Sequence, residues 1–521
     1  MLHSISRSIR NEINGSTMNQ TNQRIKQWIV IVICLIALVI IITLQSSLTI
    51  QTNFLRKNEH ILVDYVRLMN FTEEELITMI STIDSKSTTS ETLMSDEINE
   101  LLHHFNLTNI LRHFDPQARL LDSDLLDVWN FVRQIDQMLL MKATVDVKKE
   151  ADIDQRRALG LRTNLKMEEF HGITRVLRGN RLCQENHYGQ ELSVIVLVVI
   201  KPFDFGMRSL IRSTWAKQLD PEKGRLYFVI GHQSSKNQNY DLIDRMIDIE
   251  SKRFNDLIQF DYEEDYFRLT IKSIGLIRWT TIYCPLVKNV FKIDADSILN
   301  FENLFKYLNS IDLKEEKSDH RMLERRINRD DHHRNERIMI YDDLFQDFHR
   351  RHQNVQPRDM FSIHGNIWRN APVQRNSTNK FVTSHKDYSK SSYPIYTGSS
   401  YLLHGRYLST YLYWFAIRFG TPALLWEDIF VTGILVQNFA RYNIAFEHFQ
   451  MNGFQFDVMP ETIDQCFFNS SIIFNQRIGK ENLQTIWKRI NNSSTSIDLN
   501  HLHRKRLGKS CSLKLPNKFH L

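Results

Sequence analysis

Two carboxylates separated by a single residue are the part of this sequence with the clearest capacity for chemistry. Asp294 and Asp296 follow the short run 290–293, which has the character of a buried strand. Side chains alternate faces along a strand, so this spacing directs both carboxylates to the same side at its end. Two hard oxygen ligands there suit a divalent cation that keeps open positions for phosphate oxygens. Because a solvated turn explains most such tripeptides, the prediction of a metal site depends on the surrounding motifs.

A second acidic pair, Glu427 and Asp428, stands between apolar residues and precedes an apolar helical segment. Burying such a pair is costly unless the acids are ion-paired or used in chemistry. An N-terminal helix cap, where acids are favoured, is the equal alternative. Upstream, the segment 393–398 places aromatic residues around a proline and a glycine, a loop that could shape a sugar pocket.

The elements that must position these acids alternate between strands and helices. The aliphatic run 192–200 predicts a strand buried on both faces, and 226–230 predicts a second one. Helices are predicted by the residue pattern at 208–215, 241–254 and 269–279. Such alternation is typical of an open α/β sheet, in which ligands bind at the carboxyl ends of the strands. Asp294 and Asp296 are expected at that edge.

The N-terminal segment 28–44 is apolar apart from Thr43, and its length is near the lower limit for a helix that crosses a bilayer. Four basic residues and one acid precede it, whereas the flank after it is mixed, so the positive-inside rule places the N-terminus in the cytosol. No small-residue cleavage site follows, which favours a retained anchor over a cleaved signal peptide. We therefore expect a single-pass type II membrane protein.

Two further segments differ in composition from the predicted sheet. The region from 50 to 182 has the character of a stem with short amphipathic helices, and we identify no catalytic group in it. From about 312 to 358, charged residues and histidine dominate, which predicts an exposed helical or partly disordered insertion.

Charge and cysteine content narrow the class of protein. The net charge of +6 is modest for 521 residues and partly local to the C-terminal tail, so it does not indicate nucleic acid binding. In an oxidising compartment the four cysteines after the apolar segment allow three pairings, and the sequence does not choose among Cys183, Cys284, Cys466 and Cys511. Glycosylation sequons consistent with a secretory lumen occur at Asn70, Asn106, Asn376, Asn469, Asn491 and Asn492.

Taken in order, these segments resemble the β-1,3-galactosyltransferase and β-1,3-N-acetylglucosaminyltransferase family, glycosyltransferase family 31. The similar segments are 208–215 (R-x-x-I-R-x-T-W in the family), 228–231 (F-x-x-G), 250–272 (E-x-x-x-Y-x-D-I, then D-F-x-D-x-Y-x-N-L-T-x-K), Trp279 and Cys284 (W and C), 292–296 (K-x-D-D-D), 380–396 (K-W-x-V-S-x-x-x-Y ahead of Y-P-P-Y) and 427–433 (E-D-V-x-x-x-G). Each motif alone is weak, but their shared order through most of residues 183–450 is specific.

The resemblance implies a GT-A-type, Rossmann-like hexosyltransferase domain that uses a UDP-sugar and Mn²⁺ and inverts the anomeric carbon. Asp294 and Asp296 would then hold the nucleotide and the metal. Asp428 would accept the proton of the acceptor hydroxyl, with Glu427 the less favoured candidate. The residues expected to bind the donor are Arg208, Arg212, Lys272, Asp294 and Gly398. A structural role against the sheet is an equal alternative for Arg212.

The chain departs from the family pattern at several positions. Ala295 replaces the middle acid of K-x-D-D-D, and the loop around 397–399 is one residue short and lacks the usual glycine-rich run. On a strand Ala295 points away from its two neighbours, so its loss of a carboxylate need not prevent metal binding. Phe254 stands where the family has tyrosine, and Arg268 where it has asparagine.

We therefore expect a Golgi enzyme that transfers a hexose from a UDP-sugar in β-1,3 linkage to a glycan on a glycoprotein or glycolipid. Galactose is preferred over N-acetylglucosamine as the transferred sugar, and a homodimer is left open. A catalytically silent relative that binds glycans or acts like a chaperone in the lumen is the alternative. The expected segments are a cytosolic tail (1–27), a transmembrane signal anchor (28–49), a lumenal stem (50–182), the catalytic domain (183–500) and a basic C-terminal tail (501–521).

Overall fold

The structure is a computed structural model of the chain, and the residues that it describes belong to the unit Ser90–Leu521. They are residues 98–103, 116–140, 175–233, 240–322, 339–355, 361–376, 379, 381–385, 387–418, 421, 424–442, 444–456, 463, 465–475 and 480–492. The predicted membrane anchor at 28–49 lies outside them. Within these ranges, no helix combines the length and the apolar character needed to cross a bilayer.

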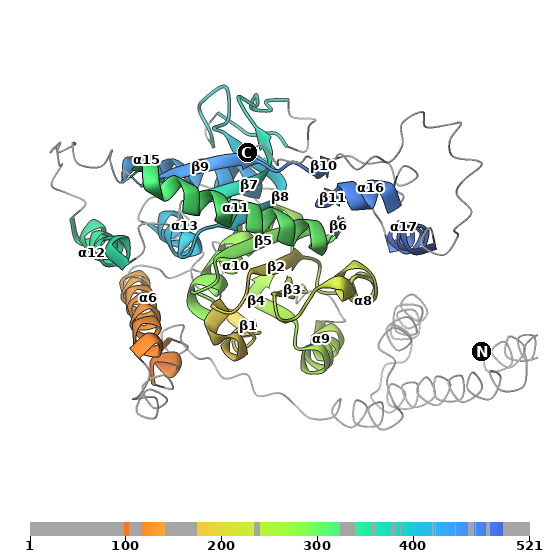
Figure 1. Cartoon of the computed structure of the whole chain (residues 1–521), viewed down its shortest axis with the longest axis horizontal. Coiled ribbons are helices and arrows are strands. Elements are labelled where there is room, and N and C mark those ends of the chain that lie inside the picture. The colour runs from red at the N-terminus through yellow and green to blue at the C-terminus, as the bar shows by residue number, and fades with distance from the viewer. Residues whose placement is uncertain are drawn as a thin grey trace, which may run out of the picture. The chain divides into compact units, whose positions relative to one another are not determined.

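An eight-stranded mixed sheet forms the centre of the domain, in the order β1-β4-β3-β2-β5-β8-β7-β9 (Figure 1). The strands β2 to β5 are parallel, β8 runs antiparallel to both β5 and β7, and β1 pairs antiparallel to β4 at the edge. The strands are β1 (Val176–Arg178), β2 (Val194–Val199), β3 (Gly224–His232), β4 (Leu257–Glu263), β5 (Asn289–Asp294), β7 (Phe361–Trp368), β8 (Tyr396–His404) and β9 (Phe446–Gln450). The predicted open α/β sheet is thus confirmed, with an antiparallel strand inserted beside β5.

The central strands are buried because helices cover both faces of a parallel sheet. All six residues of β2 are buried, as the aliphatic run predicted. Every residue of α10 from 270 to 283 is buried too, which fits a helix that is apolar on all sides. The longer helices are α6 (Pro116–Leu140), α8 (Phe205–Ser213), α9 (Tyr240–Phe254), α10 (Leu269–Tyr283), α11 (Phe301–Met322), α12 (Met339–Val355), α13 (Leu408–Ile417) and α17 (Lys480–Asn492). The shorter ones are α14 (Glu427–Ile429), α15 (Gln437–Arg441) and α16 (Gln465–Ser470), with a π-helical turn at Phe430–Leu435.

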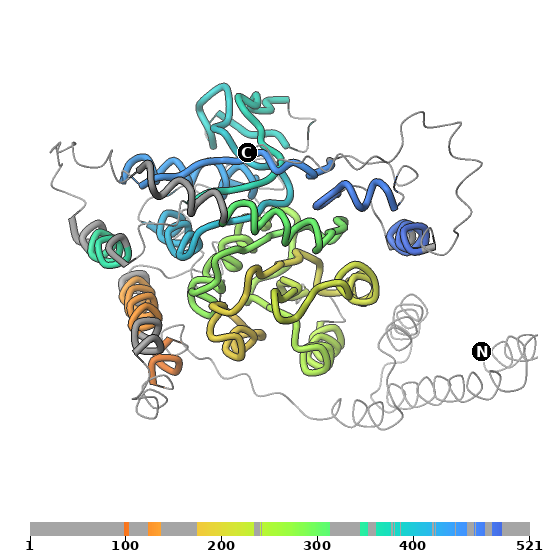
Figure 2. The backbone as a smooth tube through the Cα atoms, viewed as in Figure 1, coloured from red at the N-terminus to blue at the C-terminus, as the bar shows by residue number. Residues whose placement is uncertain are grey.

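Segments distant in sequence meet at the middle of the sheet. Figure 2 shows the tube of β5 beside that of β8. The side chain of Lys292 on β5 donates a hydrogen bond to the backbone oxygen of Ser399 on β8, which is 107 positions later in the sequence. A second sheet of three strands, β10 (Phe454–Phe456), β11 (Ile473–Asn475) and β6 (Ser297–Leu299), holds the chain that leaves β5. Both sides of the turn between β5 and β6, which contains Asp296, are therefore fixed by strand pairing.

Helix α6 corrects the predicted boundary between stem and catalytic domain at residue 183. Trp129 on α6 is fully buried and its indole nitrogen donates to the carbonyl oxygen of Ile282 on α10 at 2.7 Å. Asp136 and Arg278, both fully buried, form a second link between these helices at 3.6 Å. Part of the predicted stem is therefore a component of the domain that the sequence predicts to be catalytic, as is the edge strand β1.

Helix α12 lies within the segment predicted as an exposed helical or partly disordered insertion. Its helical structure is confirmed, but the predicted exposure is wrong for this helix. Phe345 and Phe348 are buried, and Phe348 stacks on Phe131 of α6 with ring centres 4.6 Å apart. Arg351 adds an ion pair with Asp127 of α6 at 2.8 Å. Because charged residues dominate this segment, the sequence analysis did not identify the apolar face of the helix.

A disulfide joins Cys183 to Cys284, with Cα atoms 5.6 Å apart. It connects the segment before β2 to the end of α10, and it is one of the pairings left open by the sequence. Both cysteines are fully buried.

Replacing Trp129 with alanine should lower the free energy of unfolding by about 3–5 kcal/mol, because the change leaves a cavity between α6 and α10. Gln134→Ala, at an exposed position on the same helix, should change it by less than about 0.5 kcal/mol. Urea denaturation of both variants measures this. If Trp129→Ala lowers the free energy of unfolding as little as Gln134→Ala does, α6 does not contribute to the folded domain and the predicted boundary stands.

Candidate functional site

The two acids predicted to hold a metal lie at the carboxyl end of β5, where a parallel sheet binds ligands. Asp294 is the last residue of the strand and its side chain is 37% exposed. Asp296 is exposed in the turn that follows, close enough to Asp294 for their charges to interact. The structure therefore brings together the two carboxylates and leaves both accessible.

A buried lysine stands beneath this pair. The Lys292 ammonium donates to Asp294 Oδ1 at 2.8 Å, to Glu427 Oε2 at 3.2 Å and to the backbone oxygen of Ser399 at 3.0 Å. Its side chain is only 3% exposed. Burial alone would lower the pKa of Lys292, but the charges of Asp294 and Glu427 outweigh it and raise the pKa above its usual value. Lys292 is therefore a fixed cation that joins β5, β8 and α14.

Glu427 is committed to this internal network. One carboxylate oxygen accepts from Lys292 and the other accepts from the Tyr401 hydroxyl at 2.7 Å. The residue is 7% exposed. A carboxylate held in this way balances the buried lysine and is badly placed to receive a proton from a substrate.

Asp428, the next residue, is partly exposed. Its Oδ1 accepts from the amide of Ile429 at 2.8 Å, and the amide of Ser399 also donates to its carboxylate. Burial and the charge of Glu427 raise the pKa of Asp428 to about 6. A carboxylate with that pKa can exchange a proton near neutral pH, so of the acidic pair it is Asp428 that suits general base chemistry.

Ser399 links the two predicted halves of the site. Its hydroxyl donates to Asp294 Oδ2 at 2.9 Å, while its amide donates to Asp428. Its φ of 64° lies in the left-handed region, which is unusual for a residue with a side chain. The two hydrogen bonds stabilise this conformation of Ser399. They also place Asp294 and Asp428 on opposite sides of Ser399.

The chemistry of the exposed acids fits a divalent cation. Burial alone would raise the pKa of Asp294, but Lys292 and Ser399 lower it below its usual value. Burial and the negative charge of Asp294 raise the pKa of Asp296 to about 6, as expected for neighbouring like charges. In the part of the chain that is described, no group of three or more acid, histidine or cysteine side chains could hold a metal. Two carboxylate ligands would therefore leave most coordination positions to phosphate oxygens and water.

Lys272 lies next to this network but cannot reach a ligand. Its ammonium binds Glu264 Oε1 and the carbonyl oxygen of Ile200, each at 2.8 Å, and the side chain is 1% exposed. Glu264 in turn accepts from the amide of Gly231 at 2.8 Å. The predicted donor-binding role of Lys272 is therefore replaced by a positioning role, because it ties together the ends of β2, β3 and β4.

Arg208 is also buried completely, which contradicts its predicted contact with a nucleotide. Its guanidinium binds Glu250 at 2.6 Å and donates to the carbonyl oxygens of Lys201 and Pro202. Arg212 binds Glu250 at 2.8 Å and Asp256 at 2.7 Å. Both arginines fasten α8 to neighbouring elements, which is the structural alternative that sequence analysis left open for Arg212.

Gly398, the last predicted donor-binding residue, lies against Asp428. A Cβ at this position would lie 3.7 Å from Asp428 Oδ2 and only 2.8 Å from Nε1 of Trp368. A side chain at 398 would therefore displace the indole of Trp368, and glycine permits this close approach.

Lys292, Ser399, Tyr401 and Glu264 are the residues that sequence analysis did not assign to the site. Lys292 could have been found, because it stands two residues before Asp294 and so shares its strand face. The partners of the other three lie on separate elements, and no local pattern identifies them.

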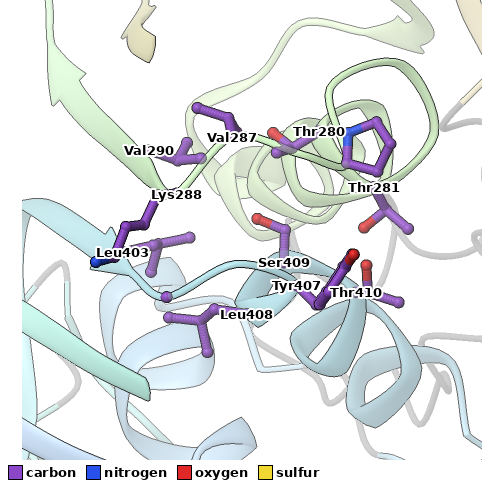
Figure 3. Close-up of a pocket in the computed structure, with 12 residues that line it drawn as sticks. Thr280, Thr281, Val287, Lys288, Val290, Leu403, Tyr407, Leu408, Ser409 and Thr410 are labelled. Carbon is purple, nitrogen blue, oxygen red and sulfur yellow. The ribbon is translucent and has the colours of Figure 1, made fainter. Parts of the chain in front are cut away.

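A small cavity elsewhere is unsuited to a nucleotide. Figure 3 shows it between α10, the segment 285–290 and α13, where Thr280, Thr281, Lys288 and Thr410 are among the lining residues. It lies at the amino end of β5, opposite Asp294. Its volume of about 10 Å³ corresponds to roughly one water molecule.

Replacing Lys292 with methionine should lower the free energy of unfolding by about 3–5 kcal/mol, because the buried Glu427 carboxylate loses its cation. Lys306→Met, which removes a surface pair with Glu302, should cost less than about 1 kcal/mol. The double variant Lys292→Met, Glu427→Gln should recover part of the loss, since it removes the uncompensated charge. Urea denaturation measures all three, and equal effects at 292 and 306 would contradict the assignment.

Comparisons with known proteins identify relatives of part of this chain. Residues 206–338 match the galactosyltransferase family model, which covers the region from α8 through the two acids. The chain is 34% identical over 122 residues to UDP-GlcNAc:betaGal beta-1,3-N-acetylglucosaminyltransferase 7 of Rattus norvegicus, covering 22% of this chain and 30% of that protein. It is 32% identical over 117 residues to UDP-GalNAc:beta-1,3-N-acetylgalactosaminyltransferase 1 of Homo sapiens, covering 22% and 35%.

A longer match of 229 residues, 25% identical, is to lactosylceramide 1,3-N-acetyl-beta-D-glucosaminyltransferase of Homo sapiens, covering 43% of this chain and 48% of that protein. The matches thus span 30% to 48% of these relatives' length. The apo structure of mouse xyloside xylosyltransferase 1 aligns with 55% of this chain and 97% of its own at 9% identity, but the TM-score of 0.21 is too low to compare folds. Residues 206–338 therefore match the galactosyltransferase family, and the curated relatives support the β-1,3-glycosyltransferase family for this part of the chain.

Proposed function

We propose that this chain is a UDP-sugar-dependent β-1,3-hexosyltransferase with a GT-A-type domain. The proposal rests on the different environments of the acids Asp294, Glu427 and Asp428. Lys292 neutralises Glu427 and holds Asp294, whereas Asp428 stays partly exposed on the other side of Ser399. The site therefore offers one set of carboxylates for a metal and a separate carboxylate for a proton.

On the donor side, Asp294 and Asp296 would hold a divalent cation, which we propose is Mn²⁺. When bound, such a cation supplies charge neutralisation to the diphosphate as it leaves. Lys292 keeps the Asp294 carboxylate in one orientation, and the strand pairing on both sides fixes the turn that carries Asp296.

On the acceptor side, Asp428 would accept the proton of the attacking hydroxyl. The acceptor oxygen forms a bond to C1 of the sugar while the bond from C1 to the diphosphate oxygen breaks. The proton passes to Asp428 Oδ2, and UDP leaves with the bonding electrons. Attack from the side opposite to UDP inverts the anomeric carbon, which requires the base and the diphosphate site to flank the sugar, as Asp428 and Asp294 flank Ser399.

The names of the relatives bear on which sugar is transferred. The three described above transfer N-acetylglucosamine or N-acetylgalactosamine, and one name specifies a β-galactose acceptor. These names support an N-acetylhexosamine as the donor sugar and a terminal β-galactoside as the acceptor. Galactose, expected from the sequence motifs, is the alternative donor, and a glycoprotein or glycolipid would carry the acceptor glycan.

We also propose that the chain works in the Golgi lumen, held by a single-pass type II anchor at 28–49. The apolar composition of that segment and the basic residues before it support this topology. Addition of an endoglycosidase to intact microsomes, before and after detergent treatment, tests it: sequons after residue 50 should be protected until detergent is added.

Substituting Asp296 with asparagine should weaken Mn²⁺-dependent UDP binding by about 100-fold or more, because even changes outside a metal's ligand set often cost about 10–100-fold. Calorimetric titration of UDP with and without Mn²⁺ gives the affinities. Asp220→Asn, a surface acid paired with Lys223, is the matched control and should leave them unchanged. If the unmodified protein binds UDP equally well without Mn²⁺, the proposed metal site at Asp294 and Asp296 is contradicted.

Asp428→Asn should lower kcat by about 10²–10⁴-fold while UDP affinity changes little, because a general base acts only in the transfer step. In the unmodified protein, kcat should fall about tenfold per pH unit below about 6, since a protonated Asp428 cannot accept the acceptor proton. The profile is measured at saturating UDP-sugar and Mn²⁺, so that occupancy of the metal site does not limit it. Full transfer by Asp428→Asn would exclude the base assignment, and well-folded protein that binds UDP but transfers no sugar would support the catalytically silent alternative.

A further inference from the structure

An exposed tryptophan stands beside the proposed base. Trp368 is the last residue of β7 and 43% of it is exposed. Among the described residues, Trp487 on α17 is half-buried and the remaining tryptophans are buried: Trp129, Trp215, Trp279, Trp414 and Trp426. An indole has a large apolar face, and at the carboxyl edge of the sheet, where ligands bind, this face is available to a ligand.

The indole is placed close to Asp428 by Gly398. The position that a Cβ of Gly398 would occupy lies 2.8 Å from Trp368 Nε1 and 3.7 Å from Asp428 Oδ2. Atoms of both side chains therefore lie within 3.7 Å of one point beside Gly398. A molecule in contact with the indole has its polar groups within reach of the carboxylate.

The rest of the surroundings holds the indole in place. Trp368 pairs with Tyr396 across β7 and β8, and the two rings are nearly parallel, with centres 6.4 Å apart and an angle of 11°. The pairing of β7 with β8 shifts register between Gly365 and Asn366. Such an irregularity re-aims the side chains that follow it, which here include Trp368.

We propose that Trp368 is the platform on which the acceptor sugar stacks, so that its reacting hydroxyl faces Asp428. This inference rests on the proposed function. A pyranose suits the position because one face presents C–H groups, which pack on an aromatic ring, while its edge presents hydroxyls. Galactose suits it best: its axial O4 leaves the hydrogens of C3, C4 and C5 together on one face. Glucose, with an equatorial O4, has no such continuous face.

Trp368→Ala should raise the KM for a β-galactoside acceptor by up to about tenfold, the upper end of what one stacked aromatic contact contributes. The KM for the UDP-sugar and the slow hydrolysis of UDP-sugar by water should stay within about twofold, because the donor side is unchanged. Trp368→Phe should keep most of the acceptor affinity. Gly398→Ala should reproduce the effect of Trp368→Ala, since a methyl group there displaces the indole. Leu177→Ala removes an apolar side chain of similar exposure, 38%, on the edge strand β1 and is the matched control.

Binding is measured separately from turnover, by saturation-transfer NMR with methyl β-D-galactoside in the presence of UDP and Mn²⁺. The unmodified protein and Leu177→Ala should both saturate the C3, C4 and C5 protons most strongly, and Trp368→Ala should lose that signal. Loss of binding by Trp368→Ala supports the platform even if no sugar is transferred, in which case only the proposed function fails. An unchanged acceptor KM, an equal loss in hydrolysis, or saturation that persists without the indole would overturn the inference.

Discussion

The structure of the site depends on one buried cation. Lys292 lies at the meeting point of β5, β8 and α14, and its ammonium is shared by Asp294, Glu427 and the backbone of Ser399. Burying a lysine is unfavourable unless its charge is balanced, so these partners must be present and correctly placed for the domain to fold. The same requirement fixes the carboxylate that would meet a metal. The contacts that balance the charge of Lys292 in the folded core are thus the same contacts that position the site.

Other buried ion pairs extend this constraint along the edge of the sheet. Lys272 and Glu264 connect the ends of β2, β3 and β4, and Arg208 with Glu250 connects α8 and the segment after β2 to α9. Buried ion pairs are weak evidence for net stability, because desolvation offsets much of the attraction between the charges. Their effect is better understood as positioning: each pair joins an element to the end of a strand, where the loops that carry chemistry begin. The donor-binding roles expected for Lys272 and Arg208 are contradicted because both side chains are buried in these pairs and do not reach the surface.

The features that the sequence predicted depend on residues close together in the chain, whereas the features that it missed depend on residues far apart in the chain. The strand at β2 and the placement of Asp294 at the end of β5 follow from local apolar runs, and the structure agrees with them. Asp296 lies in the turn after β5, so the predicted alternation of strand faces does not extend to it. Helix α6 was assigned to the stem because its apolar face has no local partner; Trp129 finds one 153 residues away on α10. Similarly, the role of Glu427 was ambiguous because Lys292 is 135 residues distant. Periodicity reports which residues are buried, but it does not report against which other residues they pack.

The segment 398–399 shows how a departure from the family pattern can be tolerated. Ser399 adopts a left-handed backbone, for which glycine is the usual residue, but its hydroxyl contributes a hydrogen bond to Asp294 that glycine would lack. Gly398 beside it remains glycine, because Trp368 occupies the space that a side chain would need. The loss of an acid at 295 has a similar explanation, since Asp294 is held by Lys292 and Asp296 by paired strands on either side, independently of the residue between them. A shorter, less glycine-rich loop therefore preserves both sides of the site: Ser399 supports the acids expected to bind the donor, and Gly398 admits the indole expected to bind the acceptor.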